Sequence, residues 1–80
     1  MNYQTKVINE YKKKGYLVLN VIRLSDSGYP DLILLKDGKT TFIECKTKTD
    51  TLKELQKFRI DKLREQGFTA FCLKDGKIIY

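Results

Sequence analysis

The chain has 80 residues, with 16 Lys or Arg against 10 Asp or Glu, which gives a formal net charge of +6 and a pI of about 9.4. This length predicts one domain over residues 1–80 with a small core, and we expect a homodimer to supplement that core. The positive charge favours a polyanionic partner, nucleic acid first, and the absence of histidine excludes a histidine base, a Ser-His triad and a His-ligated zinc site within one chain.

The two cysteines, Cys45 and Cys72, stand inside apolar runs, so they predict free core thiols rather than a disulfide framework. The sequence shows no signal-peptide pattern and no apolar run of transmembrane length. We therefore expect a cytoplasmic protein with no membrane partner.

Residues 3–14 predict a first helix, because apolar side chains recur there at helical spacing, at Tyr3, Val7, Ile8 and Tyr11. Asn2 can cap its start and Gly15 its end. Gln4 falls inside the apolar stripe, where a polar side chain must find a partner, and Glu10 lies at its edge. The helix closes with three lysines that either stabilise the helix C-terminus or contact phosphate, Lys12, Lys13 and Lys14.

Residues 16–22 form a β-prone run that is too short for a typical helix. Residues 23–29 are polar and turn-rich, and they lead directly to Pro30 and Asp31. Asp31 is therefore expected at the outer end of the strand that follows.

Two apolar runs, residues 32–36 and 40–46, flank the Asp-Gly pair at 37–38, which is the short-range signature of a β-hairpin. The second run alternates, and Glu44 and Lys46 are two residues apart. A period of two puts both side chains on one face of the strand.

A second helix is expected from Thr51 to Gln66, because Thr51 followed by Glu54 has the pattern of a capping box. Its apolar face is expected to carry Leu52, Leu55 and Leu63, with Phe58 and Ile60 flanking. Gln56 and Arg59 fall on that same face, which indicates that the face looks onto a polar site.

Residues 68–73 predict a further strand, and a second Asp-Gly turn at 75–76 precedes a short final strand over 77–80. The element order is helix, three strands, helix and one or two strands. The sequence therefore predicts a single α/β domain with a mixed β-sheet and flanking helices.

Asp31, Glu44 and Lys46 can converge if the two strands of the hairpin are neighbours. Two clustered carboxylates repel each other, and a Mg²⁺ or Mn²⁺ ion held by oxygen ligands resolves that conflict. The backbone carbonyl of Cys45 is a further candidate ligand, and Lys46 could orient or deprotonate a water. The alternative is that Asp31 caps a turn while Glu44 and Lys46 form a solvated pair on an edge strand.

These motifs in this order resemble the VRR-NUC branch of the PD-(D/E)XK nucleases, over Gly28-Tyr29-Pro30-Asp31-Leu32, Ile43-Glu44-Cys45-Lys46 and Leu55-Gln56. The resemblance runs from Tyr3-Gln4 to about Leu73. It implies a restriction-endonuclease-like core and a metal-dependent phosphodiesterase, with Asp31 and Glu44 as metal ligands and Lys46 beside the nucleophile. It also places Gln56 near the site.

The resemblance departs from the family pattern in the first helix. The family often has a glutamate near the start of that helix, followed by a glutamine. Gln4 matches the glutamine, but no acid precedes it, and Glu10 is the only acid on the helix. The number of metal ligands supplied by the chain therefore stays open.

Three functions are compatible with these features. The first is a structure-selective DNA endonuclease, such as a Holliday-junction resolvase of a phage or mobile element in a bacterial cell. The second is a nuclease that acts on flaps or ends, and the third is a non-catalytic nucleic-acid-binding module. The intact Asp31, Glu44 and Lys46 argue against the third, and the small size favours the first, because a symmetric dimer presents two sites to a four-way junction.

We expect no organic cofactor. The basic residues expected to contact DNA phosphates are Lys12, Lys13, Lys14, Arg23, Lys48 and Arg59.

Overall fold

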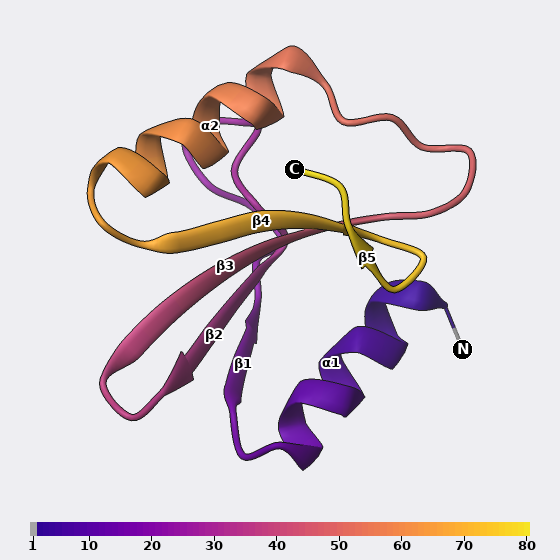
Figure 1. The fold of residues 1–80 in the computed structure, drawn as a ribbon, viewed down its shortest axis with the longest axis vertical. Helices are drawn as coiled ribbons and strands as arrows, with labels where there is room; N and C mark the ends of the chain where they lie inside the picture. Colours follow the sequence, from indigo (N-terminus) through magenta and orange to yellow (C-terminus); the bar gives the residue numbers. More distant parts are fainter. Residues whose placement is uncertain (1) are drawn as a thin grey trace.

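The computed structural model describes residues 2–80. Within these residues, two helices and five strands follow one another in the order expected from the sequence (Figure 1). The elements are α1 (Tyr3–Lys13), β1 (Leu17–Asn20), β2 (Leu32–Lys36), β3 (Lys39–Lys46), α2 (Glu54–Glu65), β4 (Thr69–Lys74) and β5 (Lys77–Ile78). The prediction of an α/β domain with a mixed sheet and flanking helices is confirmed.

The strands form one sheet in the order β1-β2-β3-β4-β5. Only the central pair, β3 and β4, is parallel, and the other neighbours are antiparallel. A parallel pair needs a crossover connection, which α2 supplies between β3 and β4. The antiparallel pairs β2–β3 and β4–β5 are instead joined by tight turns.

Both tight turns use an Asp-Gly pair with positive φ at each residue. The φ angles are 53° at Asp37 and 74° at Gly38, and 48° at Asp75 and 81° at Gly76. Positive φ at both central residues is the requirement of a type I′ turn, whose twist matches the flanking strands. The hairpins predicted from the two Asp-Gly pairs are therefore confirmed.

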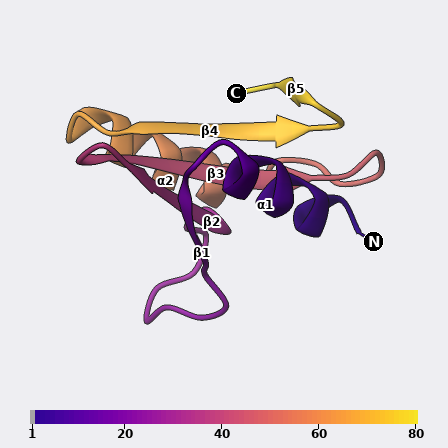
Figure 2. The ribbon, with the colours of Figure 1, turned by 90° about the horizontal axis from the view of Figure 1, so that it is seen from below.

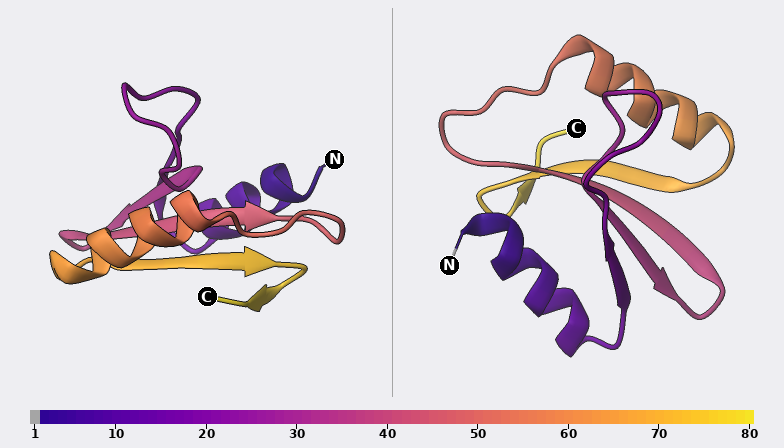
Figure 3. Two further views of the ribbon diagram at one scale, coloured as in Figure 1. Left: turned by 90° about the horizontal axis from the view of Figure 1, so that it is seen from above. Right: turned by 180° about the vertical axis from the view of Figure 1, so that it is seen from behind.

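The two helices cover opposite faces of the sheet (Figures 1 and 3). On one face, Leu32 and Ile43 pack with Val7 of α1. On the other face, Cys72 packs with Ile60 of α2. Because side chains alternate along a strand, the face on which a residue lies decides which helix it can meet. Side chains on one face of the sheet therefore pack with α1, and side chains on the other face pack with α2.

The first helix begins as the sequence predicts, because the side chain of Asn2 accepts a hydrogen bond from the backbone N–H of Thr5 at 2.8 Å. The second helix begins later than predicted, and Lys53 rather than Thr51 is its N-cap. The backbone N–H of Lys53 donates to Oε1 of Gln56 at 2.9 Å, so Gln56 takes the role expected of Glu54.

The buried face of α2 also differs from the expected one. Ile60 is fully buried, whereas Leu55 and Phe58 are half exposed. Leu52 precedes the helix and so does not follow helical spacing. The residues that do face the sheet lie at positions 56, 60 and 63, which are one and two turns apart.

None of the helices within residues 2–80 is long and apolar enough to cross a bilayer. The two cysteines are free, as predicted, with Cys72 buried and Cys45 half-buried.

Candidate active site

Asp31 and Glu44 are brought side by side by the register of the hairpin. Leu32 of β2 pairs with Ile43 of antiparallel β3. The residue before Leu32 therefore lies beside the residue after Ile43, and these are Asp31 and Glu44. The convergence expected from the sequence is present.

Glu44 and Lys46 share the α2 face of β3, as their spacing predicts. Their exposed fractions are only 4% and 8%, although both side chains are ionisable. The Nζ atom of Lys46 lies 3.5 Å from Oε2 of Glu44. A buried charge pair of this kind contradicts the alternative of a solvated pair on an edge strand, because β3 lies at the centre of the sheet.

Asp31 is anchored on both sides before β2 begins. Its Oδ2 accepts a hydrogen bond from the backbone N–H of Cys45 at 3.0 Å, and its backbone carbonyl accepts one from the N–H of Val21 at 2.7 Å. The preceding Pro30 is fully buried. The carboxylate is thus held against β3 by main-chain atoms, and its position does not depend on a flexible side-chain partner.

Glu44 has one satisfied and one unsatisfied oxygen. Oε2 meets both Lys46 and the amide Nε2 of Gln56, which donates at 3.5 Å. Oε1 is buried and has no hydrogen-bond partner within the described structure. An orphaned buried carboxylate oxygen is costly unless a proton or a cation satisfies it.

Burial, together with the neighbouring negative charge of Asp31, raises the pKa of Glu44 to about 7. Lys46 acts in the opposite direction but does not compensate. A protonated Glu44 could share a hydrogen bond with Asp31, which two ionised carboxylates cannot do. Near neutral pH the pair therefore favours a bound proton or cation over two free negative charges.

The amide of Gln56 is oriented by the helix start. A backbone N–H can only donate, so the Gln56 atom that meets the N–H of Lys53 must be the oxygen. The NH₂ group then faces Glu44, where it donates to Oε2. Gln56 therefore connects the N-terminus of α2 to the carboxylate on β3, and the structure places it beside the predicted carboxylate pair.

The donor set suits a hard divalent cation. Asp31 and Glu44 offer carboxylate oxygens, and the backbone carbonyl of Cys45 directly follows Glu44 in the chain. Within residues 2–80, no group of three His, Cys, Asp or Glu side chains is placed to hold a metal. Mg²⁺ commonly takes only one or two carboxylates and completes its shell with waters and substrate phosphate, so this sparse set fits it.

The thiols are not competing ligands. Burial and the nearby Asp31 charge raise the pKa of Cys45 to about 12, and burial raises the pKa of Cys72 as well. Both thiols stay protonated at neutral pH, and a soft metal binds the thiolate form.

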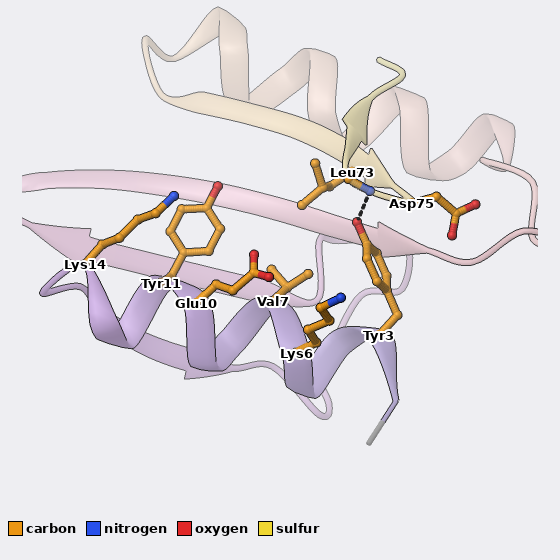
Figure 4. A pocket seen from close by; sticks show the side chains of 9 residues that line it. Tyr3, Lys6, Val7, Glu10, Tyr11, Lys14, Leu73 and Asp75 are labelled. Carbon is orange, nitrogen blue, oxygen red and sulfur yellow. Dashed lines mark hydrogen bonds between the residues drawn. The ribbon is translucent and has the colours of Figure 1, made fainter.

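The supporting residues predicted on the first helix lie elsewhere. Nε2 of Gln4 donates to Oδ1 of Asn20 at 2.9 Å, which gives this polar side chain its partner. Glu10 is exposed and lines a cavity of about 460 Å³ between α1 and the β4–β5 turn (Figure 4). Helix α1 covers the face opposite Glu44, so the structure does not bring Gln4 or Glu10 to the carboxylate pair.

The predicted DNA-contacting residues fall into three groups. Lys12, Lys13 and Lys14 are exposed at the end of α1. Arg23, in the loop between β1 and β2, and Lys48, just after β3, are exposed beside the elements that carry the site. Arg59 differs, because its Nε donates to the backbone carbonyl of Ser27 at 3.1 Å and its guanidinium lies 4.6 Å from the ring of Tyr29.

Two residues have structural roles that the sequence did not predict. Arg59 fastens the loop before Asp31 to α2, and Lys53 orients Gln56 through its main chain. Only the role of Lys53 had a local sequence pattern that could have predicted it, because residues 53 and 56 have the spacing of an N-cap and the third residue of the helix.

A mixed sheet with an aspartate before one strand and Glu-x-Lys on the next defines the class of PD-(D/E)XK nucleases. Within that class, residues 4–74 match the family model of the VRR-NUC domain. The match covers most of the chain, and the chain therefore belongs to the VRR-NUC family, a nuclease family.

Solved structures agree with this assignment. One described as a VRR_NUC domain superposes with a TM-score of 0.79 at 24% identity and covers 91% of this chain and 81% of its own. A second, described as a VRR_NUC domain protein, has a TM-score of 0.54 at 26% identity and covers 88% of this chain but 53% of its own. The first likeness shows the fold, and this chain spans about half the length of the second protein. No curated protein sequence matches the chain.

Proposed function

We propose that this chain is a Mg²⁺- or Mn²⁺-dependent DNA endonuclease that hydrolyses phosphodiester bonds and selects branched DNA, as a Holliday-junction resolvase does. The observation that carries the proposal is the unpartnered, buried Oε1 of Glu44 beside Asp31. A site held in this state is suited to a cation, and a phosphate group needs such a cation to approach two carboxylates.

Asp31, Glu44 and the carbonyl of Cys45 would hold the metal. When bound, the ion would offset the negative charge of the carboxylates, polarise the phosphoryl group and lower the pKa of a coordinated water. Asp31 and Glu44 keep their relative position because Asp31 is hydrogen-bonded to the main chain of the strand that carries Glu44.

Lys46 would act on the attacking water or on the charge that develops at phosphorus. Its Nζ is buried next to Glu44. A buried ammonium group is more effective electrostatically than an exposed one, because less solvent screens it. The ammonium can therefore orient the water or stabilise the negative charge at the pentacoordinate phosphorus, whereas only a neutral Lys46 amine could accept the proton of the water.

A homodimer is part of this proposal, and the exposed apolar residues of β1 support it. Leu17 and Leu19 lie on the α2 face of β1 and are 60% and 43% exposed. No strand pairs with the outer edge of β1 within the described sheet. A second copy over this region would cover apolar area and the strand edge, and two-fold symmetry would give two sites for two strands.

We expect the protein to select DNA by the shape of the DNA, because the residues expected to contact it are basic side chains that bind phosphates. The basic residues at the end of α1 and near the site are exposed and can contact phosphates, which position a protein without reading sequence. A four-way junction offers a distinctive arrangement of phosphates to two basic surfaces. A flap- or end-acting nuclease is the alternative within the same chemistry.

The proposal is tested with a panel of a four-way junction, a flap, a nicked duplex, a linear duplex and a single strand, each with Mg²⁺ and with Mn²⁺. We expect paired nicks in the junction and little cleavage of the linear duplex. Cleavage of flaps alone would support the alternative, and no cleavage of any DNA with either ion would overturn the nuclease assignment. Light scattering of the wild type and of Leu17→Asp tests the dimer, which the substitution should dissociate.

A further inference from the structure

A cavity of about 290 Å³ has Asp31 in its lining and no residue of β3. It is formed almost entirely by the loop between β1 and β2, and its lining includes Val21, Arg23, Leu24, Asp26, Tyr29 and Asp31. Figures 2 and 3 show this loop projecting beyond the sheet. Because Asp31 belongs both to the cavity and to the carboxylate pair, a molecule in the cavity would adjoin a group held at that pair.

The loop that forms the cavity is fastened at its second half. Arg59 of α2 donates to the carbonyl of Ser27, and its guanidinium lies 4.6 Å from the centre of the Tyr29 ring. Gly28 has a φ of +88°, and a Cβ atom there would lie 2.6 Å from Cγ of Leu55. The Tyr29 wall of the cavity is therefore held in place by α2.

The lining has the chemistry of a site for a flat heteroaromatic ring. Val21, Leu24 and the Tyr29 ring offer apolar and aromatic surface, while Arg23 and Asp26 offer hydrogen-bonding groups of both polarities. An unstacked nucleobase has the same combination of an apolar face and a polar edge. Proteins recognise such bases by stacking on aromatic side chains and by hydrogen bonds to their edges.

We propose that this cavity receives the base of an unpaired nucleotide next to the phosphate that is cut. The inference rests on the proposed function, because it places the reacting phosphate at Asp31 and Glu44. A base in an intact duplex is stacked and paired and must be extruded to enter, whereas an unpaired base is already free. The cavity thereby adds a preference for DNA that carries an unpaired base, including branched DNA that is not fully paired at its branch point, to the shape selection by the dimer.

The test compares affinities in the inactive Glu44→Gln background with metal present, using fluorescence anisotropy. The probes are a duplex with one unpaired nucleotide, the same duplex with an abasic site in place of that nucleotide, and the fully paired duplex. We expect binding to the first probe to be about tenfold tighter than to the other two, the range expected for stacking of one base.

Leu24→Asp, which places a charge in the cavity wall, should reduce this preference to less than about twofold, within the scatter of such comparisons, while binding to the paired duplex changes little. The matched control is Ile78→Asp, the same apolar-to-acidic change at an exposed position on β5, at the opposite edge of the sheet. It should keep the preference. Tyr29→Leu should also lose most of it, because leucine retains the apolar contact but cannot stack.

A preference that survives in both Leu24→Asp and Tyr29→Leu, or that persists with the abasic probe, would overturn the inference. If the wild type still cuts branched DNA in that case, the proposed function stands and only the base site fails. If the wild type cuts no DNA and binds none of the probes, the proposed function fails and the base site fails with it.

Discussion

Oδ2 of Asp31 accepts a hydrogen bond from the backbone N–H of Cys45 at 3.0 Å, so a carboxylate in a loop is fixed to the strand that carries Glu44. A side chain attached to a main-chain atom keeps its position when neighbouring side chains change. The distance between the two acids is therefore set by the β-hairpin. A substitution can remove the charge of an acid while its side chain keeps its position.

Asp31→Asn is expected to abolish most of the nuclease activity without unfolding the protein. The amide oxygen of asparagine can still accept the N–H of Cys45, but the negative charge is lost. Changes at groups that only support metal ligands cost about 10- to 100-fold, so loss of a direct ligand should cost more than about 100-fold. Cleavage rates and thermal melting would measure this, and near-normal cleavage would disprove the role of Asp31.

Lys46→Ala is expected to lower the cleavage rate by about 10²- to 10⁴-fold, the range for acid-base or electrostatic roles, while binding of metal and DNA persists. Lys62→Ala is the control, since Lys62 is exposed and its ion pair with Glu65 lies on the surface of α2. A Lys46→Ala enzyme within a few-fold of the wild type would show that Lys46 only neutralises Glu44.

Gln56 can be tested for its two hydrogen bonds separately. Gln56→Leu removes both, so we expect a loss of stability of about 1 kcal/mol from the missing cap and a fall in activity of about 10- to 100-fold. Gln56→Glu keeps an acceptor for the N–H of Lys53 but cannot donate to Glu44. It should keep the cap but stay low in activity, and because it adds a third carboxylate beside Asp31 and Glu44, its stability should recover only when Mg²⁺ offsets the repulsion. Full activity of Gln56→Leu would contradict a positioning role.

The metal-free protein is expected to become less stable as the pH rises from about 5 to 8. The pKa of Glu44 is raised to about 7 from its ordinary value of 4.5, so folding favours the protonated form. This stabilisation is complete below the pKa of Glu44 in the unfolded chain and is lost as the pH rises through the pKa of Glu44 in the folded protein. The free energy of unfolding should fall by about 1 to 3 kcal/mol.

Urea denaturation at pH 5.5 and pH 8 would measure this effect, and the absence of histidine means that few other groups titrate in that range. Glu44→Gln should remove most of the pH dependence, and Mg²⁺ should restore stability at pH 8. An unchanged free energy of unfolding in the wild type would show that Glu44 is ionised in the folded protein.

DNA binding by the inactive Glu44→Gln variant is expected to weaken steeply with salt, because phosphate contacts release counterions. Replacing one contacting lysine at the end of α1, such as Lys13, should reduce the slope of log K against log salt by about one unit. Lys62→Ala again serves as the control. Equal slopes for both variants would place the DNA away from α1.

Local sequence determined those features that depend on covalent geometry. The two-residue spacing of Glu44 and Lys46 assigned them to one face of a strand, and the two Asp-Gly pairs assigned the hairpins, because backbone period and turn conformation are set over a few residues. The hairpin in turn placed Asp31 next to Glu44. The chemistry of the carboxylate pair was therefore predictable before the fold was known.

The tertiary structure decided which groups join that pair. Whether Gln4 or Gln56 reaches Glu44 depends on which face each helix covers, and only packing separates α1 from the site. The cost of ionising Glu44 likewise arises from burial by distant segments. The contacts of Arg59 with Ser27 and Tyr29 join residues that are far apart in the chain, so no local sequence pattern could predict them. Desolvation and side-chain pairing are properties of the assembled chain, whereas periodicity is a property of its neighbouring residues.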